Sequence, residues 1–290
     1  MASTLKLWLD RVALLAPHGL WLLNQRLRAI HRARSLPWNL LQANARLKDS
    51  QRGGRCFIVG NGPSVAGLDL SLLKGENIFS VSNGYLHPSF ACYQPRFHCV
   101  PQITYGKMTE ADAVAWFIEM HAHLGDAILF LSTTEAKLVE QYGLFQGRLV
   151  HYLALQNDFE AHSQTSAVDL SKPLPRVESV PVMAIMIAMY LGFNEIYLLG
   201  VDHDHFKTGV YGYPFELKVQ RDKDLSVASD GKILINRHDD FHSLARLWSQ
   251  YRALKQIAWS SGIQIFNATP GGELDEFPRK SFNTLFGDIS

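Results

Sequence analysis

The sequence lacks several features that mark common classes of protein. Its net charge is +1 over 290 residues, so it has no basic excess of the kind that a nucleic-acid-binding face requires. Its three cysteines form no CxxC pair and no zinc-ligand spacing, and such a sparse, odd count suits a reducing compartment. No apolar run reaches the roughly 18 to 20 residues of a transmembrane helix. The start is interrupted by polar residues and has no small-residue cleavage site, unlike a signal peptide. We therefore expect a cytoplasmic protein that binds no nucleic acid.

The first part of the chain differs in composition from the rest. Residues 1–50 carry eight Lys or Arg against two Asp, and their apolar residues recur near helical spacing. We expect residues 1–54 to form a basic amphipathic helical arm. Two interpretations stay open. The arm lies in an anionic membrane interface, as a peripheral contact, or it packs on the main domain or on another subunit of a homo-oligomer.

From residue 55 onward, short apolar runs alternate with helical patterns. This alternation predicts an α/β domain over 55–290: one Rossmann-like, mostly parallel sheet with helices on both faces. The expected strands are 56–59, 78–82, 97–100, 127–132, 149–153, 195–200 and 263–267. The expected helices are 111–123, 135–142, 182–191 (with Gly192 as the C-cap) and 241–260, with Asp239 or Asp240 as a candidate N-cap. Residues 156–178 are expected to form a loop, and 202–240 an irregular lid insertion.

Ligands of parallel α/β sheets bind outside the carboxyl ends of the strands. The expected strand ends all carry short polar side chains, namely Asn61, Asn83, Ser132, Asp202 and Asn267. The sequence therefore predicts a polar binding site at this edge of the sheet.

The first strand runs into the glycine turn Gly60-Asn61-Gly62-Pro63-Ser64. Glycine lets the backbone approach a ligand closely, and a helix start offers N–H groups to an anion. The turn predicts a nucleotide-phosphate site, with a plain structural turn as the alternative. It is not the dinucleotide fingerprint, because Val65 replaces the third glycine and Asn83 replaces the acidic residue that would bind the ribose. A P-loop is absent.

Two histidine-rich segments and one arginine are further candidates. Asp202-His203-Asp204-His205 holds possible ligands of zinc, manganese or magnesium, Asp202, Asp204 and His205; the alternative is a polar loop that hydrogen-bonds backbone or ribose. His242 can accept a proton from a sugar hydroxyl, because the pKa of histidine lies near neutral pH. Arg176 can pair with a phosphate or a carboxylate.

These residues resemble motifs of the bacterial family 42 sialyltransferases. Val59–Ser64 is similar to their opening loop, and Ser82-Asn83 to the Cys-Asn that ends their second strand. Arg176–Ser179 resembles their Arg-Ile-Thr-Ser before a helix, and Gly192–Asp202 is very similar to their GYKEIYLSGID strand. His238–His242 resembles their HYIGH.

The resemblance implies an inverting glycosyltransferase that requires no cofactor or metal. It would move a sugar such as sialic acid or Kdo from a CMP-activated donor to a cell-envelope glycan, in lipopolysaccharide or capsule biosynthesis. It implies His242 as the general base, Tyr211 as the lid tyrosine that hydrogen-bonds the departing phosphate, and Arg176 as a supporting residue. The residues expected to bind nucleotide and donor, by the resemblance or by their place at a strand end, are Gly60, Asn61, Gly62, Pro63, Ser64, Asn83, Ser132, Ser179, Gly200 and Asp202.

The sequence also departs from this family. Val100-Pro101 stands where the family has the Asn-Pro that contacts the donor, so the sugar is open, and Asp204 and His205 stand where a second lid tyrosine is expected. Asn267–Gly272 resembles a sister family that includes the motility accessory factors and the archaeal pterin pyrophosphokinases. Two alternatives follow: a pterin-type pyrophosphokinase using ATP and Mg²⁺, and a non-catalytic nucleotide-binding scaffold in polysaccharide assembly.

Overall fold

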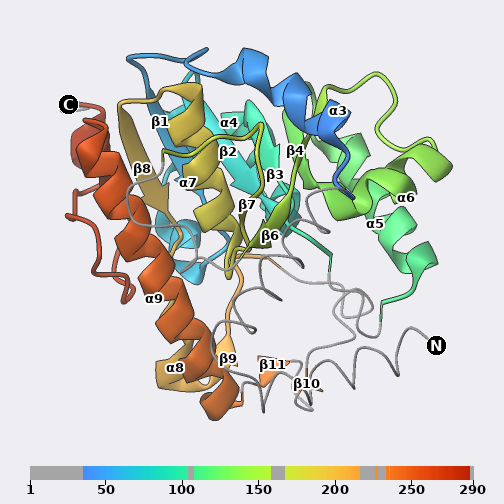
Figure 1. Cartoon of the computed structure of the whole chain (residues 1–290). Coiled ribbons are helices and arrows are strands. Elements are labelled where there is room, and N and C mark those ends of the chain that lie inside the picture. Colours follow the sequence, from blue (N-terminus) through green and yellow to red (C-terminus); the bar gives the residue numbers. More distant parts are fainter. Residues whose placement is uncertain are drawn as a thin grey trace, which may run out of the picture. The chain divides into compact units, whose positions relative to one another are not determined.

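The structure is a computed structural model that describes residues 35–103, 108–157, 167–215, 226–227, 233–234 and 236–287 (Figure 1). The chain divides into two compact units, Met1–Trp38 and Asn39–Ser290. Most of the predicted N-terminal arm, residues 1–34, lies outside the described residues. The short helix α3 (Trp38–Gln42) and a 3-10 helix (Ala43–Leu47) precede the first strand.

Seven parallel strands form one sheet in the order β12-β8-β1-β2-β3-β4-β5. Nearly every strand residue is buried, because helices cover the sheet on both sides, and this explains why the strands read as continuous apolar runs. The predicted α/β fold with a mostly parallel sheet is confirmed. The strands are β1 (Arg55–Val59), β2 (Asn77–Val81), β3 (Phe97–Cys99), β4 (Ile128–Ser132), β5 (Val150–Leu153), β8 (Glu195–Leu199) and β12 (Gln264–Asn267).

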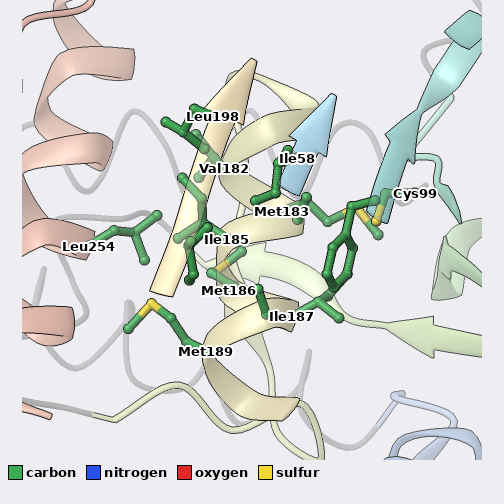
Figure 2. Close-up of a cluster of buried hydrophobic side chains, with 14 of the residues drawn as sticks. Ile58, Cys99, Val182, Met183, Ile185, Met186, Ile187, Met189, Leu198 and Leu254 are labelled. Carbon is green, nitrogen blue, oxygen red and sulfur yellow. The ribbon is translucent and has the colours of Figure 1, made fainter. Parts of the chain in front are cut away.

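One face of the sheet is covered by α7 (Val180–Leu191) and α9 (Arg237–Ser260) (Figure 1). Every side chain of α7 from Pro181 to Leu191 is buried, since the helix lies between the sheet and α9. Figure 2 shows its Val182, Met183 and Met186 packed among Ile58, Cys99 and Leu198 of three strands. The helix ends at Gly192, whose φ of 89° is the left-handed conformation of a glycine C-cap.

The opposite face is covered by a second group of helices. Ala113, Phe117 and Met120 of one helix pack with Phe57 and Ile78 of the sheet. Alternate residues of β1 therefore point to different helical layers, as the two-residue period of a strand requires. The helices in this part of the chain are α4 (Phe90–Tyr93), α5 (Glu110–His123) and α6 (Ala136–Gln141).

Three sequence-based expectations need correction. The expected loop at 156–178 contains a strand pair, β6 (Leu155–Asn157) and β7 (Leu174–Pro175). The described part of the expected irregular lid is ordered as α8 (His205–Thr208) and a three-stranded sheet of β9 (Val210–Tyr211), β10 (Ser226–Val227) and β11 (Ile233–Leu234).

The third correction concerns the start of α9. The helix begins at Arg237, and its N-cap is Asn236, whose side chain accepts a hydrogen bond of 3.0 Å from the His238 N–H. Asp239 and Asp240 therefore lie inside the first turn, where negative charge is favoured by the helix dipole. Within the described ranges, every helix falls short of the length and apolar character needed to cross a bilayer.

Candidate active site

The strand order reverses between β1 and β8. From β1 the chain builds outward through β2, β3, β4 and β5, whereas β8 and β12 add to the other side. At such a switch point the connections leave a crevice beyond the carboxyl ends of the strands. A cavity of about 610 Å³ lies there. Its described lining consists of residues 61–63, 81–83, 178–181 and 200–205 with Trp116, Thr208, Val210, Gly212 and Tyr213.

Glycines allow the segments that follow the neighbouring parallel strands β1 and β8 to approach each other closely at this cavity. The Gly60 N–H donates to the Leu199 carbonyl at 2.7 Å, and the Gly62 N–H donates to the Gly200 carbonyl at 2.8 Å. Gly200 has a φ of 63°, and a Cβ atom built on it would overlap the side chain of Val65. Only glycine fits this position without strain.

The opening loop binds a carboxylate from the protein itself. Asp202 accepts hydrogen bonds from the Ser64 hydroxyl at 2.8 Å and from the Ser64 N–H at 3.3 Å. A Cβ atom on Gly62 would overlap this carboxylate. Burial raises the pKa of Asp202, and the nearby Asp204 raises it too, against the hydrogen bonds from Ser64 that lower it. Ser64, predicted to hold nucleotide phosphate, is thus engaged by Asp202 and is not among the described lining residues.

His203 follows in an unusual backbone conformation, with a φ of 48°. Its Nε2 lies 2.9 Å from the Tyr251 hydroxyl. Burial lowers the pKa of His203 to about 3, with a further contribution from His205. Ser82, on the same cavity wall, also has a positive φ, 43°. A positive φ is costly for a residue other than glycine and persists only where the surrounding packing maintains it. Such conformations are concentrated at functional sites.

His205 and Asp240 form a nearly buried pair beside the cavity. The His205 Nε2 lies 2.7 Å from Oδ1 of Asp240, and the two side chains are 7% and 9% exposed. The second oxygen, Oδ2, is buried with no hydrogen-bond partner among the described residues. In the sequence, Asp240 was a candidate only for a helix cap. Helical spacing could have revealed its position, since Asp240 shares the buried face of α9 with Leu244 and Leu247.

His242, the base implied by the resemblance, is not brought to the described lining of the cavity. It follows Asp240 by two residues, about 200° around the helix, so it faces away from His205. Its side chain is exposed and its ring lies 4.7 Å from that of His238. The role of His242 stays a prediction.

Two asparagines and the start of α7 line the cavity. The Asn61 amide donates to the Val81 carbonyl at 3.1 Å. Trp116, which the sequence reasoning missed, donates its indole N–H to Oδ1 of Asn83 at 2.8 Å and so fixes the orientation of that amide. Ser179 is the N-cap residue of α7 and makes no side-chain capping bond. The positive end of the α7 dipole therefore points toward the cavity, a position that suits an anionic ligand.

Other predicted residues lie elsewhere. Ser132 is buried and its hydroxyl accepts from the Thr134 N–H. The Arg176 side chain is exposed outside the described lining, and its backbone carbonyl accepts from Gln250. Gly60 supports the floor without lining the cavity. Tyr211 lies in β9, but its side chain is outside the part of the chain that the structure describes.

The described lining is acidic. It includes Glu178, Asp202 and Asp204, and none of its described members is lysine or arginine. Arg246 of α9 offsets one of these charges, because its Nε and Nη2 donate to the two oxygens of Glu178 at 2.7 and 3.2 Å. Among the described residues, no three His, Cys, Asp or Glu side chains are grouped to hold a metal ion.

No protein-family model matches this chain, and no curated protein matches it either. Solved structures of sialyltransferases are among those to which this chain is similar. The sialyltransferase CstII from Campylobacter jejuni in complex with cytidine-5'-monophosphate is 15% identical, with 79% of this chain and 85% of that chain covered and a TM-score of 0.46. A Cst-II variant in complex with CMP is 17% identical over 77% and 84% of the two chains (TM-score 0.48).

A third structure, of Cst-II in complex with a trisaccharide acceptor and CMP, is 17% identical over 78% of this chain and 85% of that chain, with a TM-score of 0.46. All three TM-scores lie below 0.5, and a likeness of this degree says nothing of what this protein binds.

Proposed function

We propose that the protein is a glycosyltransferase that moves a sugar from a CMP-activated donor to a glycan acceptor. One observation carries the proposal. Four segments that are far apart in sequence, around Asn61, Asn83, Ser179 and Gly200, each resemble a family 42 sialyltransferase motif, and all four line one cavity at the switch point of the sheet. A chance resemblance in any single segment would not require the segments to meet in space.

The donor would lie along the floor and one wall of this cavity. The N-terminus of α7, with Ser179, presents the positive end of the helix dipole to the phosphate. The amides of Asn61 and Asn83 supply hydrogen bonds to the nucleotide, and Gly200 permits its close approach to the backbone. The acidic lining favours a donor with few phosphate charges, which a CMP-sugar satisfies better than a nucleoside triphosphate.

The reaction would be a single displacement. The acceptor oxygen attacks the anomeric carbon, the bond from that carbon to the phosphate oxygen breaks, and CMP leaves with the bonding electron pair while Tyr211 donates to its phosphate. A histidine takes the proton of the acceptor hydroxyl. His242 is the candidate by its motif, whereas His205 is the candidate by its position on the cavity wall and its bond to Asp240. Arg176 would support the site from a position outside the described lining of the cavity.

The acceptor class rests on the sequence. We propose a cell-envelope glycan as the acceptor. We also propose that residues 1–50 contact either a membrane surface or another subunit. Most of that segment lies outside the described residues. No cofactor is required by the proposed reaction.

The pterin-type pyrophosphokinase is the second candidate function. Asp202 and Asp204 favour it, because Mg²⁺ binds through one or two carboxylates together with substrate phosphates. The hydrogen bonds from Ser64 to both oxygens of Asp202 favour glycosyl transfer instead, since they give that carboxylate a structural partner.

Calorimetric titration of the purified protein with CMP and with ATP, each in EDTA and in Mg²⁺, separates the two candidates. We expect CMP to bind in EDTA, and Asn83→Ala to weaken it about tenfold through the loss of one hydrogen-bonding side chain. Asn283→Ala is the matched control, because the Asn283 side chain is exposed and is not among the described residues that line the cavity. Binding of ATP only, and only with Mg²⁺, would favour the pyrophosphokinase.

The base is identified by a transfer assay on His205→Gln and His242→Gln. The base variant should lose transfer while it keeps CMP affinity. If the wild type binds CMP but transfers no sugar, the scaffold alternative is supported and the proposal of an enzyme fails. If transfer survives both substitutions, neither histidine is the base.

A further inference from the structure

Two histidines occupy consecutive turns of α9 near its N-terminus. His238 and His242 are both exposed, and their rings lie 4.7 Å apart between centroids with an angle of 67° between the planes. Residues four apart on a helix lie on the same face. The pair is therefore accessible from solvent, and its two imidazole rings lie close enough to contact the same small ligand.

A neighbouring carboxylate gives this pair a further feature of a metal site. Oδ1 of Asp239 lies 3.1 Å from Nδ1 of His238. Histidines that bind metals characteristically use one ring nitrogen for the metal and the other for a carboxylate or carbonyl, which fixes the tautomer and the ring orientation. In this arrangement Nε2 of His238 is the nitrogen left for a metal ion.

The electrostatic environment of the pair is balanced. The positive end of a helix dipole disfavours a cation by about 0.3 to 1 kcal/mol. Asp239 and Asp240 both lie in the first turn of α9 and oppose this effect. Arg237, the first residue of α9, adds one positive charge, so the two carboxylates offset both this charge and the dipole.

We propose that His238 and His242 form a two-histidine site for a transition-metal ion such as Zn²⁺, with Asp239 as the outer carboxylate and water completing the coordination shell. Imidazole nitrogens favour zinc, copper and nickel, whereas magnesium and calcium favour oxygen ligands. The site does not rest on the proposed sugar transfer, although both would use His242. It has one consequence for it, because a metal on His242 and a proton taken up by His242 would use the same ring and exclude each other.

The test is a calorimetric titration of the full-length protein with ZnCl₂ in a buffer that does not chelate metals. Loss of either histidine, in His238→Gln or His242→Gln, should weaken zinc binding about 100-fold, because the second ligand of a pair binds intramolecularly. Asp239→Asn should weaken it about tenfold, as for the loss of an outer partner of a ligating histidine. Cu²⁺ and Ni²⁺ should also bind, and Mg²⁺ should not.

His123→Gln is the matched control, since His123 is another exposed histidine near the end of a helix and bonds the Glu119 carbonyl. It should bind zinc as the wild type does. Because all three histidines are exposed, circular dichroism should show the same fold for every variant. Equal zinc affinity in His238→Gln, His242→Gln and the wild type would overturn the site. Absence of CMP binding together with intact zinc binding would count against the proposed function and leave the metal site in place.

Discussion

The carboxyl ends of the strands fall into two groups. After β1, β2 and β8, the polar residues Asn61, Asn83 and Asp202 line the cavity. After β4 and β12, Ser132 and Asn267 are buried and bond nearby backbone groups. All five look alike in the sequence. The difference shows that a polar residue at a strand end becomes available to a ligand only where the strand order opens a crevice.

Two local structures close the second group of strand ends. The chain turns directly from β4 into a 3-10 helix that Ser132 caps. Beyond β12, the segment after Asn267 folds back on itself, and the Arg279 guanidinium donates to the Thr269, Gly271 and Gly272 carbonyls. In both places, backbone groups of the protein form the hydrogen bonds of the polar side chain, Ser132 or Asn267, so that this side chain is not available to a ligand.

The largest effect is expected where the segments that follow β1 and β8 approach each other. Gly200→Ala forces a side chain into a left-handed conformation and into Val65, so we expect a loss of about 3 kcal/mol of stability and of CMP binding. Gly67→Ala is the control, because a Cβ atom there meets nothing within 4 Å. Urea unfolding measures both. Equal stability of the two variants would show that this close approach does not require glycine at position 200.

A pair of asparagine substitutions tests the comparison directly. Asn267→Ala removes bonds of 2.8 Å to the Leu274 carbonyl and 3.0 Å from the Thr269 N–H in a buried site, and should cost about 2 kcal/mol without changing CMP affinity. Asn61→Ala should cost less stability but weaken CMP binding about tenfold. If both variants lose CMP affinity equally, the two groups of strand ends do not differ in function.

The smallest effect near neutral pH concerns the charge state of His203, which follows β8. Burial holds the pKa of His203 near 3, below the value of about 6.5 in an unfolded chain. The unfolded state therefore binds more protons between these values. The stabilisation is complete above pH 6.5 and is lost as pH falls toward 3, by about 1 kcal/mol at pH 6.

Two measurements check this prediction. The wild type should lose stability as pH falls from 6.5, and His203→Gln should lose less over the same range. The ring resonances of His203 should stay those of a neutral imidazole down to about pH 4, since its pKa is about 3. A titration midpoint close to 6.5 would contradict the buried environment of this strand end.

Much of the fold was predictable because its signals are local. The apolar runs matched the strands to within a residue or two, and Gly192 marked the end of α7. The start of α9 was misplaced by four residues, because Asn236 supplied the cap that Asp239 or Asp240 was expected to supply. The strand pair β6–β7 was missed because its two strands are very short and a long polar segment, residues 158–173, separates them in the sequence.

The site was predictable only in part. Asn61, Asn83, Ser179, Gly200 and Asp202 were each marked by their place after a strand or before a helix. Trp116 was not, because its role depends on a hydrogen bond to a residue 33 positions away. The pairing of His205 with Asp240, 35 positions apart, was likewise hidden.

The sequence by itself determined the alternation of strands and helices, and the glycines that let β1 and β8 approach each other, because apolar periodicity and positive φ are properties of short segments. Only the tertiary structure decided which strand ends open into the cavity, that Ser64 binds Asp202, and that Asp240 faces His205 while His242 faces away. These outcomes depend on strand order and on the rotation of α9 about its axis, and neither is written in any local pattern of residues.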